Sequence, residues 1–225
     1  MIADRRAVRA RFAAALLTMA VGTARADTPP PAASAAAPLI EGVDFGWVDP
    51  PMPAPPGRNQ VIVFLRPCTT VAASAWAAAR DLRGRHHEGT QGVPYPGVLR
   101  ADDVTAARLA LAAWRVGGGR AGMEQFLDAC AQAPSLVRSA PALRDWVRAQ
   151  GWGARAFTQA ANGDWVLEHV VPLPDLMRAY GITALPTAVV DGRYRVPWNK
   201  GMTTDRFRHI LRVILRHATV PPAPP

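Results

Sequence analysis

Residues 180–194 read YGITALPTAVVDGRY, and no other stretch says more about the fold. Two arms rich in β-branched and aromatic residues, 187–190 and 193–196, flank the dipeptide Asp191-Gly192. Asp-Gly between two such arms is typical of a two-residue hairpin turn, because both residues tolerate the left-handed backbone that the turn requires. The stretch therefore predicts an antiparallel hairpin immediately after Pro186.

A strand that runs directly into a helix is predicted upstream of this hairpin. Residues 60–65, QVIVFL, form a short apolar run that fits a strand buried on both faces. The alanine-rich residues 69–82 follow, and Thr69 or Thr70 is suited to cap the helix. Helical spacing places the following residues on one face: Val71, Ala75, Trp76, Ala79 and Leu82. Cys68 stands at the junction, and a strand followed by a helix is half of a βαβ unit.

Helical periodicity dominates from residue 101 to about residue 161. Apolar residues recur there every three or four positions, and the breaks fall at the glycines 117–119, at Pro134 and at residues 151–153. The glycine triplet is not a phosphate-binding loop, since no strand precedes it and no Gly-Lys-Ser/Thr follows. A last helix is predicted at residues 203–217, with an apolar face formed by Phe207, Ile210, Leu211, Ile214 and Leu215.

This order of elements, together with two local strings, resembles the DsbA-like thiol:disulfide interchange proteins. Residues 180–194 are similar to that family's cis-proline loop and the hairpin after it. Residues 41–45, EGVDF, and the run 61–64 are similar to its opening strand and to the strand that leads to its active site. The resemblance covers roughly residues 40–218. It implies an α/β fold class, a thioredoxin-like fold with an inserted all-helical domain.

The resemblance also implies where a redox site would lie. The family carries Cys-x-x-Cys where the strand meets the helix, and here residues 67–71 read Pro-Cys-Thr-Thr-Val. Cys68 fits the position of the attacking cysteine. Val71 occupies the position of the second, resolving cysteine, which this chain has lost. The family commonly buries an acidic residue in the preceding strand, but residues 61–64 are entirely apolar. Because a buried carboxylate can mediate proton transfer, its absence argues against fast dithiol turnover. The site therefore has the pattern of a degenerate active site.

Three interpretations of Cys68 remain open. It is a catalytic monothiol of lowered pKa that forms mixed disulfides, or a small apolar core residue left by a lost site. In the third, it bonds to Cys130, the only other cysteine of the chain. A disulfide needs Cα atoms within about 7 Å, which the family architecture makes unfavourable for these two residues. Cys130 itself lies on an apolar helical face and is otherwise expected in the core.

Pro186 is the sharpest feature that the resemblance supplies. In thioredoxin folds the equivalent proline is cis, and the residue before it offers its backbone to an extended substrate chain. Leu185 would supply that backbone here, so Leu185 and Pro186 are the expected substrate-binding residues. An ordinary trans turn proline is the alternative.

The N-terminus predicts export. Arginines at positions 5 to 11 precede an apolar stretch at residues 12–22, and Ala24 and Ala26 suit a signal peptidase. The first 26 residues carry five Arg and one Asp, so they account for four of the nine net positive charges. Much of the net positive charge therefore belongs to the predicted targeting segment. Export would place the mature protein in an oxidising compartment, the periplasm, where cysteines act as disulfide or redox groups.

The predicted organisation has six parts. They are a signal peptide at 1–26, a Pro/Ala linker at 27–38, a first thioredoxin-like part at 39–100, the helical insertion at 101–161, a second thioredoxin-like part at 162–218 and a disordered tail at 219–225. Two cysteines exclude a disulfide-dense scaffold. The five histidines are scattered, so neither a metal site nor a cofactor is expected. Without aromatic platforms beside the basic residues, nucleic acid is not an expected partner.

Two functions follow from these observations. The first is an exported thiol:disulfide interchange relative, with monothiol exchange at Cys68 at most. Its partners would be unfolded or extended polypeptides, glutathione and a membrane redox protein. The alternative is a redox-inactive peptide-binding chaperone or accessory of an envelope assembly.

Overall fold

The computed structural model describes residues 38–53, 60–80, 82 and 90–218. The predicted signal peptide, the linker before Pro38, the C-terminal tail and the histidines 86 and 87 lie outside the described residues. In the described part of the chain, none of the helices combines the length and the apolar character that a membrane crossing requires.

The described strands form one mixed sheet in the order β1-β5-β4-β2-β3. Their bounds are β1 (Gly46–Trp47), β2 (Gln60–Leu65), β3 (Gln91–Pro96), β4 (Thr187–Val190) and β5 (Tyr194–Pro197). β2 runs parallel to β3 and antiparallel to β4, with Phe64 opposite Thr187. The end of β2 and the start of β4 therefore meet at the same edge of the sheet, which brings the Cys68 junction and the Pro186 loop to one end.

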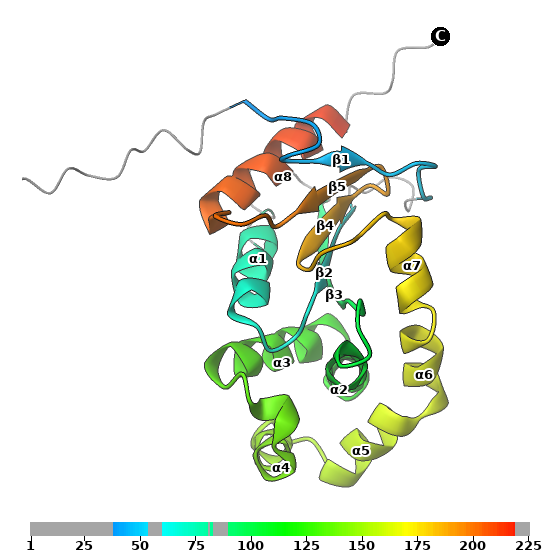
Figure 1. Ribbon diagram of the computed structural model, residues 1–225. Helices are drawn as coiled ribbons and strands as arrows, with labels where there is room; N and C mark the ends of the chain where they lie inside the picture. Colours follow the sequence, from blue (N-terminus) through cyan, green and yellow to red (C-terminus); the bar gives the residue numbers. More distant parts are fainter. Residues whose placement is uncertain (1–37, 54–59, 81, 83–89, 219–225) are drawn as a thin grey trace, which may run out of the picture. The chain divides into compact units, whose positions relative to one another are not determined.

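Helices cover both faces of the sheet (Figure 1). α1 (Thr70–Arg80) and α8 (Thr204–Ala218) lie on one face, and α7 (Leu173–Ala179) lies on the other. Side chains alternate along a strand, so Val61, Val63 and Leu65 join the core under α1 and α8, while Phe64 joins the core under α7. β2 is buried on both faces, as its continuous apolar run predicts.

The two helices beside the sheet test the sequence prediction in detail. All five predicted face residues of α8 are 3% exposed or less, which confirms that face. In α1 the prediction is right for Ala75, Trp76 and Ala79 but wrong for Val71, which is 40% exposed. Val71 lies in the first turn of α1, and the buried residue of that turn is Ala72, which precedes Ala75, Trp76 and Ala79 at helical spacing on one face.

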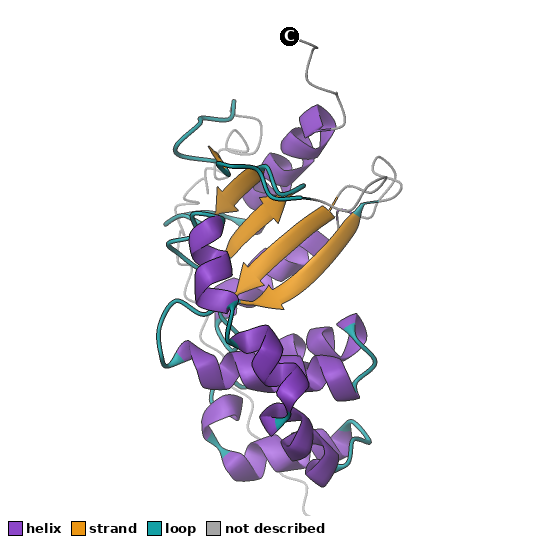
Figure 2. Ribbon diagram, turned by 90° about the vertical axis from the view of Figure 1, so that its right-hand side faces the viewer, coloured by secondary structure: helices purple, strands orange, loops and turns teal. Residues whose placement is uncertain are grey.

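The helical insertion follows β3 and precedes β4 along the chain, and its helices lie beyond one end of the sheet (Figure 2). It contains α2 (Asp103–Val116), α3 (Arg120–Gln132), the 3-10 turn η3 (Leu136–Arg138), α4 (Ala140–Ala149), α5 (Ala154–Asn162) and α6 (Asp164–Val170), and helix continues through α7 to Ala179. Gly118 and Gly119, at φ 76° and 81°, separate α2 from α3. The triplet is therefore a helix break. Trp146 packs edge-on against Phe126, Trp152 and Phe157 in the core of the insertion.

The predicted hairpin forms, with one difference in its loop. Val190 pairs with Tyr194, so three residues rather than two connect β4 to β5. Asp191 and Gly192 adopt φ 49° and 65°, and the Arg193 N–H donates to the Val190 carbonyl at 3.0 Å. The Asp-Gly turn is thus present, and Arg193 is added to it as an extra residue. The α/β fold class with inserted helices is confirmed.

Candidate functional site

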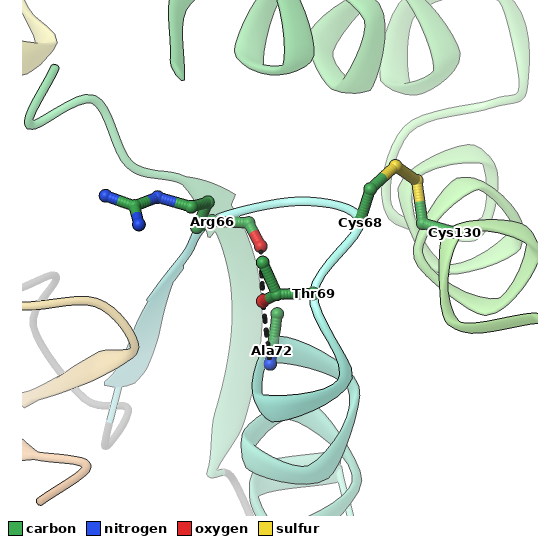
Figure 3. Close-up of a disulfide and its surroundings, with 5 residues drawn as sticks. All are labelled: Arg66, Cys68, Thr69, Ala72 and Cys130. Atoms are coloured by element: carbon green, nitrogen blue, oxygen red, sulfur yellow. Dashed lines mark hydrogen bonds between the residues drawn. A yellow bond between two sulfur atoms is a disulfide. The ribbon is translucent and has the colours of Figure 1, made fainter. Parts of the chain in front are cut away.

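The junction between β2 and α1 is held by a threonine. The Thr69 hydroxyl donates to the Arg66 carbonyl at 3.0 Å and accepts from the Ala72 N–H at 3.2 Å (Figure 3). Thr69 is therefore the helix cap, one of the two residues that the sequence offered. Cys68 precedes the cap, so it is farther from the helix N-terminus than a cap residue would be. The stabilisation of a Cys68 thiolate by the helix dipole is correspondingly smaller, because this effect falls off within the first turn.

Cys68 is bonded to Cys130 of α3. Their Cα atoms are 4.2 Å apart and the bond spans 62 residues of sequence, so the expectation that the fold keeps these two residues apart is wrong. Both cysteines of the chain are consumed, and no free thiol is left. Cys68 has φ 61°, a left-handed conformation that costs a non-glycine residue roughly 1–2 kcal/mol. Figure 3 shows the two side chains directed toward each other.

The two sulfur-bearing residues differ in exposure. Cys68 is half-buried and lines a cavity of about 590 Å³, whereas Cys130 is 1% exposed. The cavity is also lined by Thr69, Arg100, Asp102, Pro134 and Arg138. An exchange reagent that enters the cavity would therefore meet Cys68 first.

An ion pair between a buried carboxylate and a partly exposed arginine lies beside this junction. Asp103, 5% exposed at the start of α2, binds the Arg66 guanidinium with an Nε to Oδ1 distance of 2.8 Å. Its Oδ2 also accepts from the backbone N–H groups of Leu99 and Arg100, both at 3.0 Å. One carboxylate thus ties the residue after β2 to the loop after β3. β2 itself carries no carboxylate, and sequence reasoning did not single out Arg66 or Asp103, although an Asp at a helix start is a recognisable signal.

The Leu185–Pro186 loop lies at the same end of the sheet. The Leu185–Pro186 peptide bond is cis. The Thr187 hydroxyl donates to the Ala184 carbonyl at 2.8 Å, and the Trp198 N–H donates to the Pro186 carbonyl at 2.9 Å. Within the described part of the chain, the backbone N–H and carbonyl of Leu185 form no hydrogen bond. The loop is fixed on both sides of Leu185, whose own backbone groups have no hydrogen-bond partner among the described residues.

The structure thus brings some of the predicted site residues together and leaves others apart. It joins Cys68 to Cys130 and brings Leu185 and Pro186 to the same edge, but it leaves Val71 exposed on α1. The cavity at Cys68 is lined by residues of the β2–α1 junction, the segment before α2, α2 itself and the segment after α3. Among the described residues, no group of three or more His, Cys, Asp or Glu side chains is arranged to hold a metal ion.

Solved structures share the fold of this chain. DsbA from Pseudomonas aeruginosa superposes with a TM-score of 0.69 at 14% identity, over 80% of this chain and 95% of that one. Oxidoreductase DsbA from Xylella fastidiosa gives 0.65 at 18% identity, over 81% and 98% of the two chains. Oxidoreductase NmDsbA3 from Neisseria meningitidis gives 0.61 at 21% identity, over 80% and 97%.

The chain has a DsbA-like fold. By sequence, no protein-family model and no curated protein matches it. At these identities the likeness concerns the fold, so the chemistry of this DsbA-like chain has to be argued from its own residues.

Proposed function

We propose that this DsbA-like chain is an exported thiol:disulfide interchange protein that acts on extended polypeptides. The observation that carries the proposal is the Cys68–Cys130 disulfide at the junction of β2 and α1, at the same edge of the sheet as the Leu185–Pro186 loop. Reactive sulfur and a polypeptide-docking backbone at one edge are the two parts that such a reaction requires.

The docking part rests on Leu185. An extended chain adds to a protein by pairing its backbone with free N–H and C=O groups, and Leu185 presents one of each. The neighbouring residues are fixed, because Thr187 and Pro186 are buried. Thr187 is hydrogen-bonded to Ala184, and Pro186 is hydrogen-bonded to Trp198. A preformed docking loop of this kind reduces the ordering cost of binding.

The sulfur part rests on Cys68. A thiolate from a polypeptide or from glutathione attacks its Sγ, forms a mixed disulfide there and releases the Cys130 sulfur as a thiolate. Cys68 is the accessible member of the pair, and its cavity carries Arg100 and Arg138, whose positive charge favours an approaching thiolate. No cofactor takes part in this reaction.

Export belongs to the same proposal. The N-terminal 26 residues have the pattern of a cleaved signal peptide, and a periplasmic location supplies the oxidising conditions in which disulfides persist. A membrane redox partner would recycle the bond. Cell fractionation with antibody detection checks the location: the mature protein is expected in the periplasmic fraction, shortened at Ala26.

The test uses Cys130→Ser, which leaves Cys68 as a free thiol. A peptide whose single cysteine is bonded to glutathione should transfer onto Cys68, and mass spectrometry should find about one peptide per protein. Cys68→Ser is the matched control and should form no adduct. The same peptide with N-methyl groups beside its cysteine cannot pair fully with Leu185, so its transfer should slow about fivefold, the effect of one hydrogen bond. A Cys68 thiol that forms no adduct would remove the interchange function.

A redox-inactive polypeptide-binding protein is the second candidate. Cys130 is 1% exposed, and Cys68 precedes the helix cap, two features of a structural bond. In that case a peptide would bind at the Leu185 loop with the same Kd whether the protein is oxidised or reduced, and Cys68 would not exchange. Fluorescence titration of a labelled, cysteine-free peptide checks the binding that both candidates require, and the peptide-transfer assay with Cys130→Ser separates them, because only the first candidate predicts an adduct on Cys68.

A further inference from the structure

The geometry points to Cys130, in the helical insertion, as the resolving cysteine of this protein. This inference rests on the proposed interchange at Cys68 and adds the second redox residue, which lies in a different element from the one that the sequence pattern suggests. The position three residues after Cys68 holds Val71, whose side chain is 40% exposed on α1. The sulfur that completes the pair comes instead from α3, 62 residues further along the chain.

The backbone at Cys68 explains why the partner lies on α3. With φ 61°, Cys68 turns its side chain away from the first turn of α1 and toward α3, as Figure 3 shows. Thr69 fixes this turn by bonding to Arg66 on one side and to Ala72 on the other. A left-handed non-glycine residue is costly, and such residues are concentrated at functional sites.

The pair has the asymmetry that exchange requires. One sulfur must be reachable by the incoming thiolate, and the other must leave and then stay within reach to attack again. Cys68 lines the cavity of about 590 Å³, while Cys130 is 1% exposed on the far side of the bond. An incoming thiolate therefore attacks Cys68, and Cys130 is the leaving group.

The electron balance is that of a dithiol exchange. The first substrate thiolate bonds to Cys68 Sγ, and the electron pair of the broken S–S bond goes to Cys130, which takes up a proton from water. A second substrate thiolate then attacks the substrate sulfur and releases Cys68 as a thiolate. The substrate loses two electrons and becomes a disulfide, and the protein becomes a dithiol. Glutathione disulfide restores the bond in two steps. The Cys68 thiolate attacks it, binds one glutathione as a mixed disulfide and releases the other as a thiolate; the Cys130 thiolate then attacks Cys68 Sγ, re-forms the internal bond and releases the second glutathione.

α3 holds Cys130 in place without the bond. Met123 and Phe126 are 1% and 0% exposed in the core around it. The Arg120 guanidinium donates to the Gly92 carbonyl of β3 at 2.8 Å and lies 5.0 Å from the ring centre of Trp76 of α1. These contacts anchor α3 to the sheet and to α1, so reduction leaves the two thiols close together at a high effective concentration.

The charges at the cavity favour the same direction of attack. Asp103 neutralises Arg66, whose side chain points away from the disulfide in Figure 3. Arg100 and Arg138 remain at the cavity against the exposed Asp102. The excess of positive charge stabilises a thiolate at Cys68 once the bond is open.

The first experiment adds glutathione disulfide to the reduced full-length mature protein and follows its mass. The reduced wild type is expected to regain its internal disulfide with no lasting adduct, whereas Cys130→Ser should rise to about one bound glutathione per protein. Cys68→Ser should stay unmodified, because its remaining thiol is buried. Near-ultraviolet circular dichroism of each protein verifies that it is folded.

The outcomes separate the inference from the proposed function. A lasting glutathione adduct on the wild type as well as on Cys130→Ser would overturn the role of Cys130 while leaving exchange at Cys68. A Cys130→Ser variant that binds no glutathione would overturn both the role of Cys130 and the proposed exchange at Cys68.

The second experiment needs no variant. If Cys68 is attacked in the folded protein, the rate of reduction by dithiothreitol should change by less than about twofold at urea concentrations below the unfolding transition. A bond that is only structural opens through unfolding, so its reduction rate would climb steeply with urea. That result would overturn the inference even where a variant fails to fold.

Discussion

Two loops meet at one edge of the sheet, and they are stabilised in different ways. The loop after β2 is tied by the Cys68–Cys130 bond to the helical insertion and by Arg66 to Asp103 of α2. The loop before β4 is held by hydrogen bonds of Thr187 and Pro186 and by packing of Leu185 against the core cluster of Phe64 and Met177, and the backbone of Leu185 has no hydrogen bond within the described part of the chain. The first loop therefore depends on a covalent bond to the insertion, whereas the second depends on the sheet and on packing with α7.

This difference indicates that sulfur chemistry and polypeptide docking are separable here. In a Cys-x-x-Cys protein both sulfurs belong to one helical turn, so their reactivity is local. In this chain the second sulfur comes from α3, and any change in how the insertion packs should affect the sulfur pair before it affects the Leu185 loop.

The largest expected effect comes from removal of the disulfide. Cys130→Ser should lower the free energy of unfolding by about 4 kcal/mol, because the bond closes a loop of 62 residues in the unfolded chain. Urea denaturation followed by tryptophan fluorescence measures the loss. Peptide affinity at the Leu185 loop, measured where the variant is folded, should stay the same.

Cys68→Ser and the double variant are the controls. Both should lose as much stability as Cys130→Ser, since all three break the same bond. Losses that add up in the double variant would mean that each cysteine acts through its own packing, and the contrast between a covalent and a hydrogen-bonded loop would fail.

Most of the fold follows from local sequence signals. The apolar run of β2, the Asp-Gly turn after β4 and the apolar stripe of α8 each specify their element within a few residues. Val71 illustrates the limit. Its spacing to Ala75 fits the buried face of α1, but Val71 lies in the first turn, two residues after the Thr69 cap, and Ala72 is the residue buried there.

The sulfur pair was harder to predict because it is a tertiary contact. Nothing in the residues around Cys68 or Cys130 encodes how α3 is placed against the start of α1. The left-handed backbone of Cys68 has no sequence signal either, since glycine is the usual residue there. The Arg66–Asp103 pair likewise joins residues 37 positions apart. By contrast, Leu185 and Pro186 were located from their own string, because a short loop before a hairpin is a local feature.

Asp103 gives the second-largest effect. Asp103→Ala should cost about 2–3 kcal/mol of stability, because it strands the Arg66 guanidinium and two backbone N–H groups without their acceptor. Asp103→Asn keeps one acceptor and the shape, so it should cost less. Thermal unfolding measures both. The rate of reduction by dithiothreitol should rise in both variants if Asp103 positions the junction, and an unchanged rate would confine Asp103 to stability.

Thr187 probes the other loop. Thr187→Val keeps the shape of a side chain that is 2% exposed but removes its bond to the Ala184 carbonyl, so it should cost about 1 kcal/mol. Peptide binding should weaken several-fold while the reduction rate of the disulfide stays the same. Thr183→Val, at an exposed neighbour, is the matched control and should change neither. A change in the disulfide alone would contradict the separation of the two loops.

The smallest effect lies at the opposite end of β4, away from both loops. Burial raises the pKa of Asp191, although the Gln60 N–H and Arg193 act in the lowering direction. A carboxyl with a raised pKa holds its proton in the folded state while the unfolded chain has released it. Its contribution to stability is therefore fully present below the ordinary pKa of 3.8 and falls as pH rises through the raised value. Asp191→Asn keeps an oxygen to accept from Gln60 and cannot ionise. Between about pH 3 and pH 7 the wild type should lose stability relative to this variant, as urea midpoints would show.

A gain of stability over this pH range would mean that the hydrogen bond from Gln60 and the charge of Arg193 outweigh burial. In either case peptide binding and the reduction rate should not follow this titration, because Asp191 touches neither loop.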